Sequence, residues 1–287
     1  MPRWPASVMD LALAAHFEYL YEVGHHHGIA SSTLCGAVWL SPHLAGTCRA
    51  IFPAADKSAR GWKKQQPSAH RPPIPKIVAL SIAHELVLMN RLECALLVWL
   101  LFESYLRVEE CLQLHAKQIV PGIRGSRGLT RFTTLLSSDA TLGQTAKNAE
   151  VNHSVPLDLH CQKPLAETLE RLAALKNPLQ RMWCTSYQQL ANAFQQACKN
   201  LKIKPGQYCL HCLRHGGASE DRAAGHRSLT SVMGRGNWKA LTSVRRYDKS
   251  ALLARELNLW TPVQRQALAS RSEKFVTDSK TIFAKLL

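Results

Sequence analysis

The sequence has no apolar run long enough to cross a membrane. Its longest uninterrupted run, Cys94–Phe102, is nine residues, whereas a transmembrane helix needs about 20. The first residues lack a basic start followed by a sustained apolar stretch, so we expect no secretory signal. Nine cysteines without a regular spacing favour reduced thiols over a disulfide framework. We therefore expect no membrane partner, and a location that is nuclear in a eukaryote and otherwise cytoplasmic.

Acidic residues are also scarce. The chain has 20 Asp and Glu against 36 Lys and Arg, which gives a formal net charge of +16 over 287 residues. A surplus of this size indicates a polyanionic partner, and it favours nucleic acid over a small metabolite. Apolar residues make up 46% of the chain, which is enough for a hydrophobic core and excludes a disordered chain.

The composition changes most sharply at Gly61–Pro75, which has four prolines, three basic residues and no acidic residue. Such a segment is expected to be extended and solvated. We predict a short helical N-terminal segment at 1–60, a linker at 61–75, a main domain at 76–260 and an amphipathic tail at 261–287. The N-terminal segment is predicted to hold one helix at Val8–Gly24 and a second helix capped by Ser31 or Ser32.

Helical patterns dominate the main domain. The predicted helices are Ile77–Met89, Leu92–Phe102, Val108–Ala116, Pro164–Lys176, Tyr187–Asn200, Leu213–Ala224, Ser228–Met233 and Leu241–Ala254. Arg131–Ser137 and Ser154–Leu157 have the β-branched, alternating character of short strands. The sequence therefore predicts a mainly α-helical fold with a small β-hairpin or sheet insert.

The stretch 208–249 carries the most informative chemistry, and Lys and Arg outnumber Asp and Glu within it. His211 and Arg214 are three residues apart and share a face if the segment is helical. Trp238 and Tyr247 follow, nine apart, with two arginines directly before the tyrosine. Basic donors around a phenol suit its attack on a phosphodiester, because arginines hold the non-bridging oxygens with paired donors and stabilise the charge of the transition state.

These residues resemble the C-terminal signature of the tyrosine recombinases, the phage-integrase family. The family's pattern is His-x-x-Arg, then His or Trp, then a nucleophilic Tyr nine residues on. Upstream, Tyr105–Leu112 resembles the family's first box, in which Arg107 would be the catalytic arginine and Glu110 a structural acid. His215 follows the second arginine directly and would give further structural support.

The family's catalytic lysine is matched by Lys147, the only lysine between Lys117 and Lys163. It precedes Val155-Pro156-Leu157, which is similar to the Val-Pro-Leu strand that follows the family's lysine. The resemblance covers roughly residues 76–255. The stretch 213–219 is also similar to recombinases of eukaryotic mobile elements, the DIRS and crypton types.

The resemblance implies a helical catalytic domain at 76–260 that cleaves and rejoins double-stranded DNA through a 3′-phosphotyrosyl intermediate, in integration or excision of a mobile element. Tyr247 would be the nucleophile, and Arg107 and Arg214 would hold the phosphate. Lys147 would protonate the leaving oxygen. His211 would assist proton transfer or orient the phosphate, and Trp238 would donate its N–H to the phosphate. The resemblance implies no cofactor, no metal and a homo-oligomer, a tetramer, on DNA.

Two other interpretations stay open. A type IB topoisomerase uses a similar residue set, and a domesticated or inactive copy would bind DNA without cutting it. Cys209-x-x-Cys212 has a zinc-like spacing, but no second suitable pair follows, so we interpret it as buried thiols beside the active-site helix.

The tail at 261–287 begins with a break at Pro262 and then presents an apolar stripe that must be buried somewhere. Its members are Val263, Leu268, Phe275, Ile282 and Phe283. The family resemblance favours docking of this tail on a neighbouring protomer. Packing against its own domain is the alternative.

Overall fold

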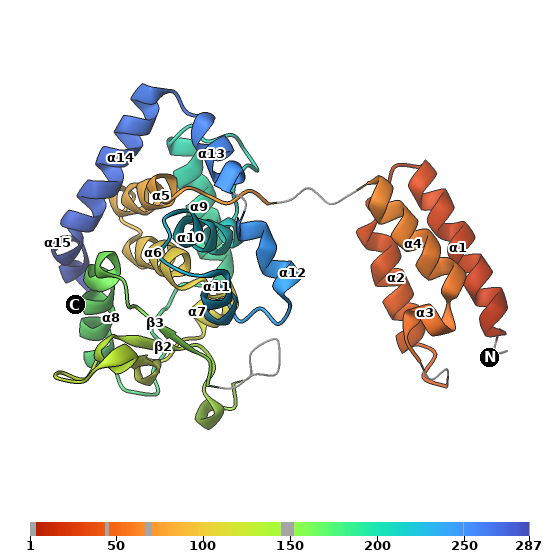
Figure 1. Ribbon diagram of the computed structural model, residues 1–287, viewed down its shortest axis with the longest axis horizontal. Coiled ribbons are helices and arrows are strands. Elements are labelled where there is room, and N and C mark those ends of the chain that lie inside the picture. Colours follow the sequence, from red (N-terminus) through yellow and green to blue (C-terminus); the bar gives the residue numbers. More distant parts are fainter. Residues whose placement is uncertain (1–3, 44–45, 67–70, 145–151, 249, 287) are drawn as a thin grey trace. The chain divides into compact units, whose positions relative to one another are not determined.

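The computed structural model describes residues 4–43, 46–66, 71–144, 152–248 and 250–286. The chain forms two compact units, Met1–His70 and Arg71–Leu287, which we describe separately (Figure 1). None of the described helices is both long enough and apolar enough to cross a membrane.

The described part of the N-terminal unit is helical, with α1 (Ala6–Glu22), α2 (Gly28–Trp39), α3 (Cys48–Ile51) and α4 (Pro53–Gln65). Its core is formed by Phe17, Phe52 and Trp62, which are almost fully buried. The carboxylate of Asp10 on α1 accepts hydrogen bonds from the first backbone N–H groups of α4, at 3.0 and 2.8 Å. This long-range cap fixes the start of α4 against α1.

Two sequence predictions for this unit are wrong in detail. Ser31 and Ser32 lie inside α2, which begins at Gly28, so neither of them is its cap. Residues 61–65 continue α4 instead of starting the extended segment. Trp62 explains this, because its burial in the core holds the last turn of the helix in place.

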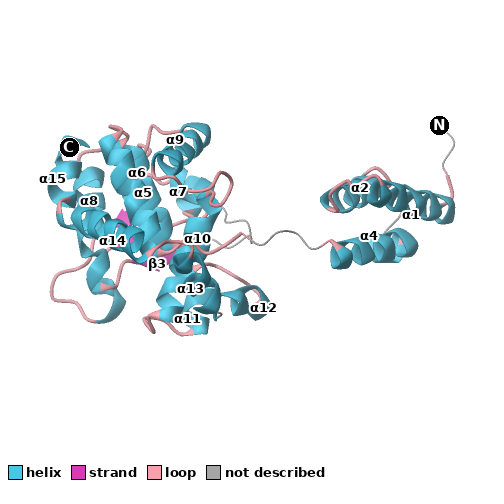
Figure 2. Ribbon diagram, turned by 90° about the horizontal axis from the view of Figure 1, so that it is seen from above, coloured by secondary structure: helices cyan, strands magenta, loops and turns pink. Residues whose placement is uncertain are grey.

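The second unit is built around α5 (Lys76–Leu88) and α6 (Leu92–Ser104), which pack against each other. The nine-residue apolar run is the middle of α6 and is buried on every side. Around this pair lie α7 (Val108–Leu112), α8 (Lys163–Ala174), α9 (Tyr187–Asn200) and α10 (Leu210–Ala223) (Figure 2). A helix that is apolar all round must be central, so the run predicts the position of α6 as well as its conformation.

The strands form an antiparallel sheet in the order β1-β2-β3, made of β1 (Ile119–Val120), β2 (Thr134–Leu136) and β3 (Ser154–Pro156). Leu135 pairs with Ile119 on one side and with Val155 on the other, and all three side chains are buried in the main core. The predicted mainly α fold with a small sheet insert is confirmed. The two-residue β1 was not predicted, because it is too short to show alternation.

The predicted helix Leu241–Ala254 is interrupted in the structure. After α11 (Leu229–Arg235) come α12 (Leu241–Val244), the 3-10 turn η5 (Arg245–Asp248) and α13 (Ser250–Asn258). Val244 and Tyr247 are both buried in one small cluster. The two residues are three apart, a spacing that places side chains on the same side of a helical turn.

The C-terminal tail packs on its own domain, and the prediction that it docks on a neighbouring protomer is wrong for its buried side chains. It forms α14 (Pro262–Thr277), α15 (Ser279–Phe283) and η6 (Ala284–Leu286), with α14 alongside α5 (Figure 1). Phe275 and Phe283 are buried against Trp99 of α6, with ring centres 5.1 and 6.4 Å away. The Ser81 hydroxyl of α5 donates to the Leu268 carbonyl at 2.9 Å.

Candidate active site

Helix α10 carries three of the predicted residues on one face. His211, Arg214 and His215 lie in its first two turns, at spacings of three and four residues that bring side chains together. The helix lies very close to α6: a Cβ atom added at Gly217 would be only 1.9 Å from the Phe102 carbonyl oxygen. Only glycine allows this approach, so the two glycines after His215 fix the depth at which α10 packs.

Arg214 is held rigidly, and only 3% of its surface is exposed. Its guanidinium donates hydrogen bonds to the backbone carbonyls of Tyr105 and Gly236. It also lies 4.3 Å from the centre of the Trp238 ring, as in a cation–π contact. The pKa of Arg214 is lowered to about 10, mainly by burial and to a smaller extent by the positive charge of Arg107. The group therefore stays charged at neutral pH and forms a preorganised cation.

Arg107 stands at the start of α7 and is oriented by Glu110 one turn later. Its backbone N–H donates to the Glu110 carboxylate at 2.9 Å, and its guanidinium forms an ion pair with the same group. The chain enters this turn through Tyr105, which has a left-handed φ of 58°. The supporting role of Glu110 stays a prediction.

Tyr247 sits in η5 with its hydroxyl oxygen 2.7 Å from Nδ1 of His215. Its ring lies between those of His215 and Trp238, at centroid distances of 5.4 and 5.0 Å. His211 extends the row, with its ring edge-on to His215 at 4.7 Å. The Tyr247 side chain is buried, at 3% exposure, and a phenolate at this position would stabilise the Arg214 cation. The sequence predicts only a supporting role for His215 and gives no sign of this hydrogen bond, because residue spacing does not report ring orientation.

A cavity of about 560 Å³ opens beside Arg107 and His211, which line it. The charged and titratable side chains that line it are Arg71, Arg107, Glu109, Glu110, Cys209 and His211, and Tyr187 lies on its wall. Glu110 is already paired with Arg107. The volume is typical of a ligand site, and its cationic groups suit a phosphate.

Lys147 lies outside the described residues. It belongs to the segment between β2 and β3. His153, at the described end of that segment, contacts α11, with its Nε2 atom 3.0 Å from the Gly234 carbonyl oxygen. The hairpin is therefore attached to the helix that leads into the Trp238 turn.

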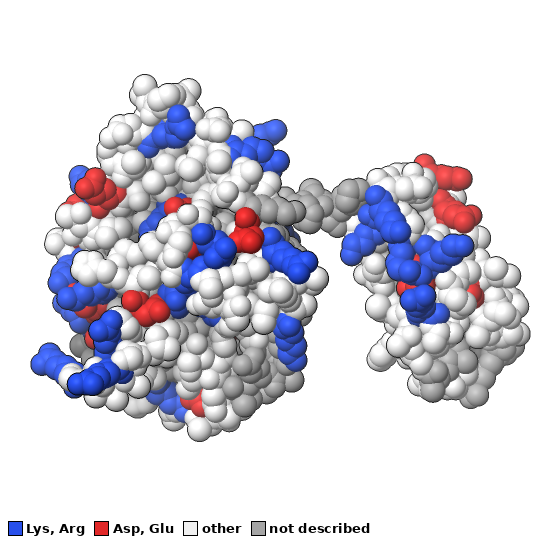
Figure 3. Space-filling model, in the orientation of Figure 1, with Lys and Arg blue, Asp and Glu red and all other residues white. Residues whose placement is uncertain are grey.

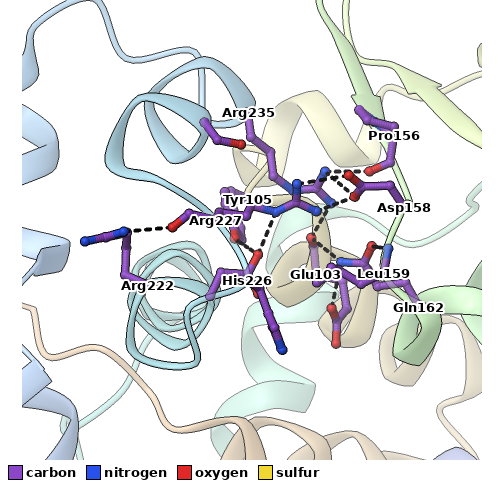
Figure 4. A network of polar contacts seen from close by, with 12 residues as sticks. Glu103, Tyr105, Pro156, Asp158, Leu159, Gln162, Arg222, His226, Arg227 and Arg235 are labelled. Carbon is purple, nitrogen blue, oxygen red and sulfur yellow. Dashed lines mark hydrogen bonds and ion pairs between the residues drawn. The ribbon is translucent and has the colours of Figure 1, made fainter. Parts of the chain in front are cut away.

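A buried polar network that the sequence did not predict lies beneath the site (Figure 4). The Arg235 side chain is 3% exposed and donates to the backbone carbonyls of Pro156 on β3 and Glu103 on α6. Burial, and then the like charge of Arg227, lowers the pKa of Arg235. This one guanidinium joins the sheet, the central helix and α11.

The same network reaches Arg214 through Tyr105. Arg227 forms ion pairs with Asp158 and Asp221, and the Tyr105 hydroxyl donates to Asp221. Burial raises the pKa of Asp158, but the hydrogen bond and charge of Arg227 outweigh it and lower that pKa. Because the Tyr105 carbonyl accepts from Arg214, the network fixes one of the two carbonyls that hold the cation.

No protein-family model and no curated protein matches the sequence. Among solved structures, the chain is similar to the XerH site-specific recombinase bound to its difH substrate in a pre-cleavage complex, at 16% identity and a TM-score of 0.45, over 84% of this chain and 74% of that one. It is also similar to XerH bound to a palindromic difH substrate in a post-cleavage complex, at 16% identity and a TM-score of 0.46, over 84% and 75%.

Across the described ranges, no three His, Cys, Asp or Glu side chains are grouped so that they could hold a metal ion.

Proposed function

We propose that this protein cleaves and rejoins double-stranded DNA by transferring a phosphoryl group to Tyr247. The observation that carries the proposal is the hydrogen-bonding distance of 2.7 Å between the Tyr247 hydroxyl and Nδ1 of His215, close to the buried cation Arg214. A phenol, a ring nitrogen that can take its proton and a fixed cation are what nucleophilic attack on a phosphodiester needs.

In the proposed reaction, His215 accepts the phenolic proton and the Tyr247 oxygen attacks phosphorus. The phosphotyrosyl bond forms as the bond to the 5′-oxygen breaks. Arg107 and Arg214 stabilise the charge on the non-bridging oxygens. A guanidinium has five N–H donors, so Arg214 can keep its two carbonyl partners while further donors face the phosphate. Lys147 protonates the departing 5′-oxygen, and the reverse steps rejoin the strand.

We further propose that η5 moves when DNA binds. The Tyr247 hydroxyl has to meet the phosphate in line with the leaving oxygen, and the side chain is buried in the described conformation. The outer end of η5 is held by an ion pair between Arg222 and Asp248, of which Asp248 is 48% exposed. A solvent-exposed ion pair contributes little stability, so this contact opposes the movement only weakly.

Contacts to the DNA backbone come partly from the N-terminal unit in this proposal. Helix α4 presents exposed basic residues, one of which, Arg60, forms an ion pair with Asp56. Figure 3 shows Lys and Arg gathered over this helix. These residues are Lys57, Arg60, Lys63 and Lys64. Such a surface binds phosphates without reading sequence. We propose that the protein assembles on DNA as a homo-oligomer, a tetramer, and acts in integration or excision of a mobile element.

The test uses a nicked duplex from which the short cleaved strand diffuses away, so that the covalent protein–DNA adduct accumulates. The full chain should form an adduct that survives denaturation and maps to Tyr247. Tyr247→Phe should form none but should bind duplex DNA nearly as tightly, because affinity comes mostly from many phosphate contacts.

Tyr187 provides a control tyrosine, because it lines the cavity beside Arg107 and His211 and is 49% exposed. Tyr187→Phe should leave adduct formation unchanged. An adduct that persists in Tyr247→Phe and disappears in Tyr187→Phe would refute the assignment. Binding without any adduct would favour a domesticated DNA-binding protein, and relaxation of supercoiled DNA without a specific site would favour a topoisomerase.

A further inference from the structure

Two cysteines meet at the start of α10, and one of them, Cys209, lines the cavity. Cys209 is the residue before the first turn and Cys212 lies three residues into the helix. Their sulfur atoms are 3.7 Å apart, and the Cys209 backbone N–H also donates to the Cys212 sulfur at 3.4 Å. Cys209 is half-buried and lines the cavity, whereas Cys212 is 1% exposed. One thiol is therefore accessible and the other lies behind it.

The surroundings of the two thiols shift their pKa values in opposite directions. The hydrogen bond from Cys212 lowers the pKa of Cys209, and the backbone N–H groups of His211 and Cys212 and the charge of Arg71 act in the same direction. The hydrogen bond to Cys209, and then burial, raises the pKa of Cys212. Cys209 is therefore the thiol that ionises more readily, and the thiolate is the reactive form of a cysteine.

We propose that Cys209 and Cys212 are an oxidisable dithiol that exchanges with a low-molecular-weight disulfide. The Cys209 thiolate attacks one sulfur of that disulfide, forms a mixed disulfide and releases the first small thiolate. Cys212 then loses its proton and attacks the Cys209 sulfur, which forms the intramolecular bond and releases the second small thiolate. Counted from the two thiols, the protein loses two protons and two electrons, and the small disulfide is reduced to two thiols.

The local backbone can close this bond with a small movement. The sulfur atoms must approach from 3.7 Å to about 2.0 Å, the length of a disulfide bond. Cys209 is the N-cap of α10 and has an extended backbone conformation, with φ −132° and ψ 169°, while its carbonyl accepts a hydrogen bond from the Cys212 N–H at 2.8 Å. Its side chain can therefore turn towards Cys212 while α10 stays intact. The resulting loop contains His211, so the redox state is set directly beside the site.

The inference goes beyond DNA cleavage and is tested without it. The reduced full chain is incubated with oxidised glutathione, the remaining thiols are alkylated, and the protein is digested with trypsin. Residues 203–214 form one tryptic peptide, and its only cysteines are Cys209 and Cys212. We expect this peptide to escape alkylation and to be lighter than its reduced form by about 2 Da, the two hydrogens lost in oxidation.

Single variants separate the two steps. Cys212→Ser should stop at a stable mixed disulfide between Cys209 and glutathione, and Cys209→Ser should leave the peptide reduced. Cys184→Ser, which removes an exposed cysteine elsewhere on the unit, should oxidise at residues 203–214 like the natural chain. If Cys212→Ser does not fold, the natural chain and Cys209→Ser still decide the question. A natural chain whose peptide stays reduced, or keeps glutathione on Cys209 without resolving it, would overturn the proposal.

Discussion

Replacing Gly217 by alanine tests whether the close approach of α10 and α6 builds the site. A Cβ atom there would lie 1.9 Å from the Phe102 carbonyl oxygen and 2.9 Å from the Tyr105 ring. An ordinary contact begins at 3.4 Å, so the two backbones must separate by about 1.5 Å, the difference between 3.4 and 1.9 Å. The nearest atom is a backbone carbonyl oxygen at the end of α6, so no flexible side chain can absorb the shift.

The expected magnitude follows from two opposing effects. Alanine in a helix is favoured over glycine by about 1 kcal/mol, whereas overpacking of a dense core costs about 1–3 kcal/mol and occasionally more. Because backbone must move here, we expect overpacking to win and to leave a net loss of about 2 kcal/mol. For a unit of this size, that loss lowers the melting temperature by roughly 4–8 °C.

The assay is differential scanning calorimetry of the full chain, in which the larger transition reports on residues 71–287. Gly234→Ala is the matched control, because a Cβ atom at this helical glycine meets nothing within 4 Å. It should leave the melting temperature unchanged or raise it slightly. Gly217→Ala should also lose adduct formation, since moving α10 pulls Arg214 away from the Tyr105 carbonyl. A Gly217→Ala protein that melts at or above the natural chain would refute the packing argument.

Two further predictions use other parts of the same unit. Duplex DNA should slow the alkylation of Cys209 in the cavity but not that of exposed Cys184, measured by peptide mass spectrometry, and equal rates at both sites would contradict a phosphate site in the cavity. The pKa of His84 is lowered mainly by burial and then by the positive charges of Arg271 and Lys274. As the pH falls below about 6.5, the His84 side chain is therefore protonated in the unfolded chain before it is protonated in the folded one. Stability should therefore decrease from pH 7 to 5, and His84→Gln should reduce that decrease in a series of thermal melts; an unchanged pH dependence would show that His84 does not contribute.

Local patterns determined the elements of this protein. Apolar periodicity predicted α9 to the residue and the middle of α6, because an all-apolar run can be stable only at the centre of a core. The strands β2 and β3 followed from β-branched alternation. The candidate residues in the second half of the site were also visible in the sequence, since His211 and Arg214 need only one helical turn to come together.

Tertiary structure alone decided how these elements meet. The apolar stripe of the tail required burial, but only the packing of Phe275 and Phe283 on Trp99 showed that its own domain provides it. The Arg235 network joins residues up to 132 positions apart, and such pairings leave no local periodicity. The hydrogen bond between His215 and Tyr247 likewise joins α10 to η5, across 32 positions of the chain. Spacing along a chain fixes which side chains share a face, whereas their partners across the core are chosen by the packing of whole helices.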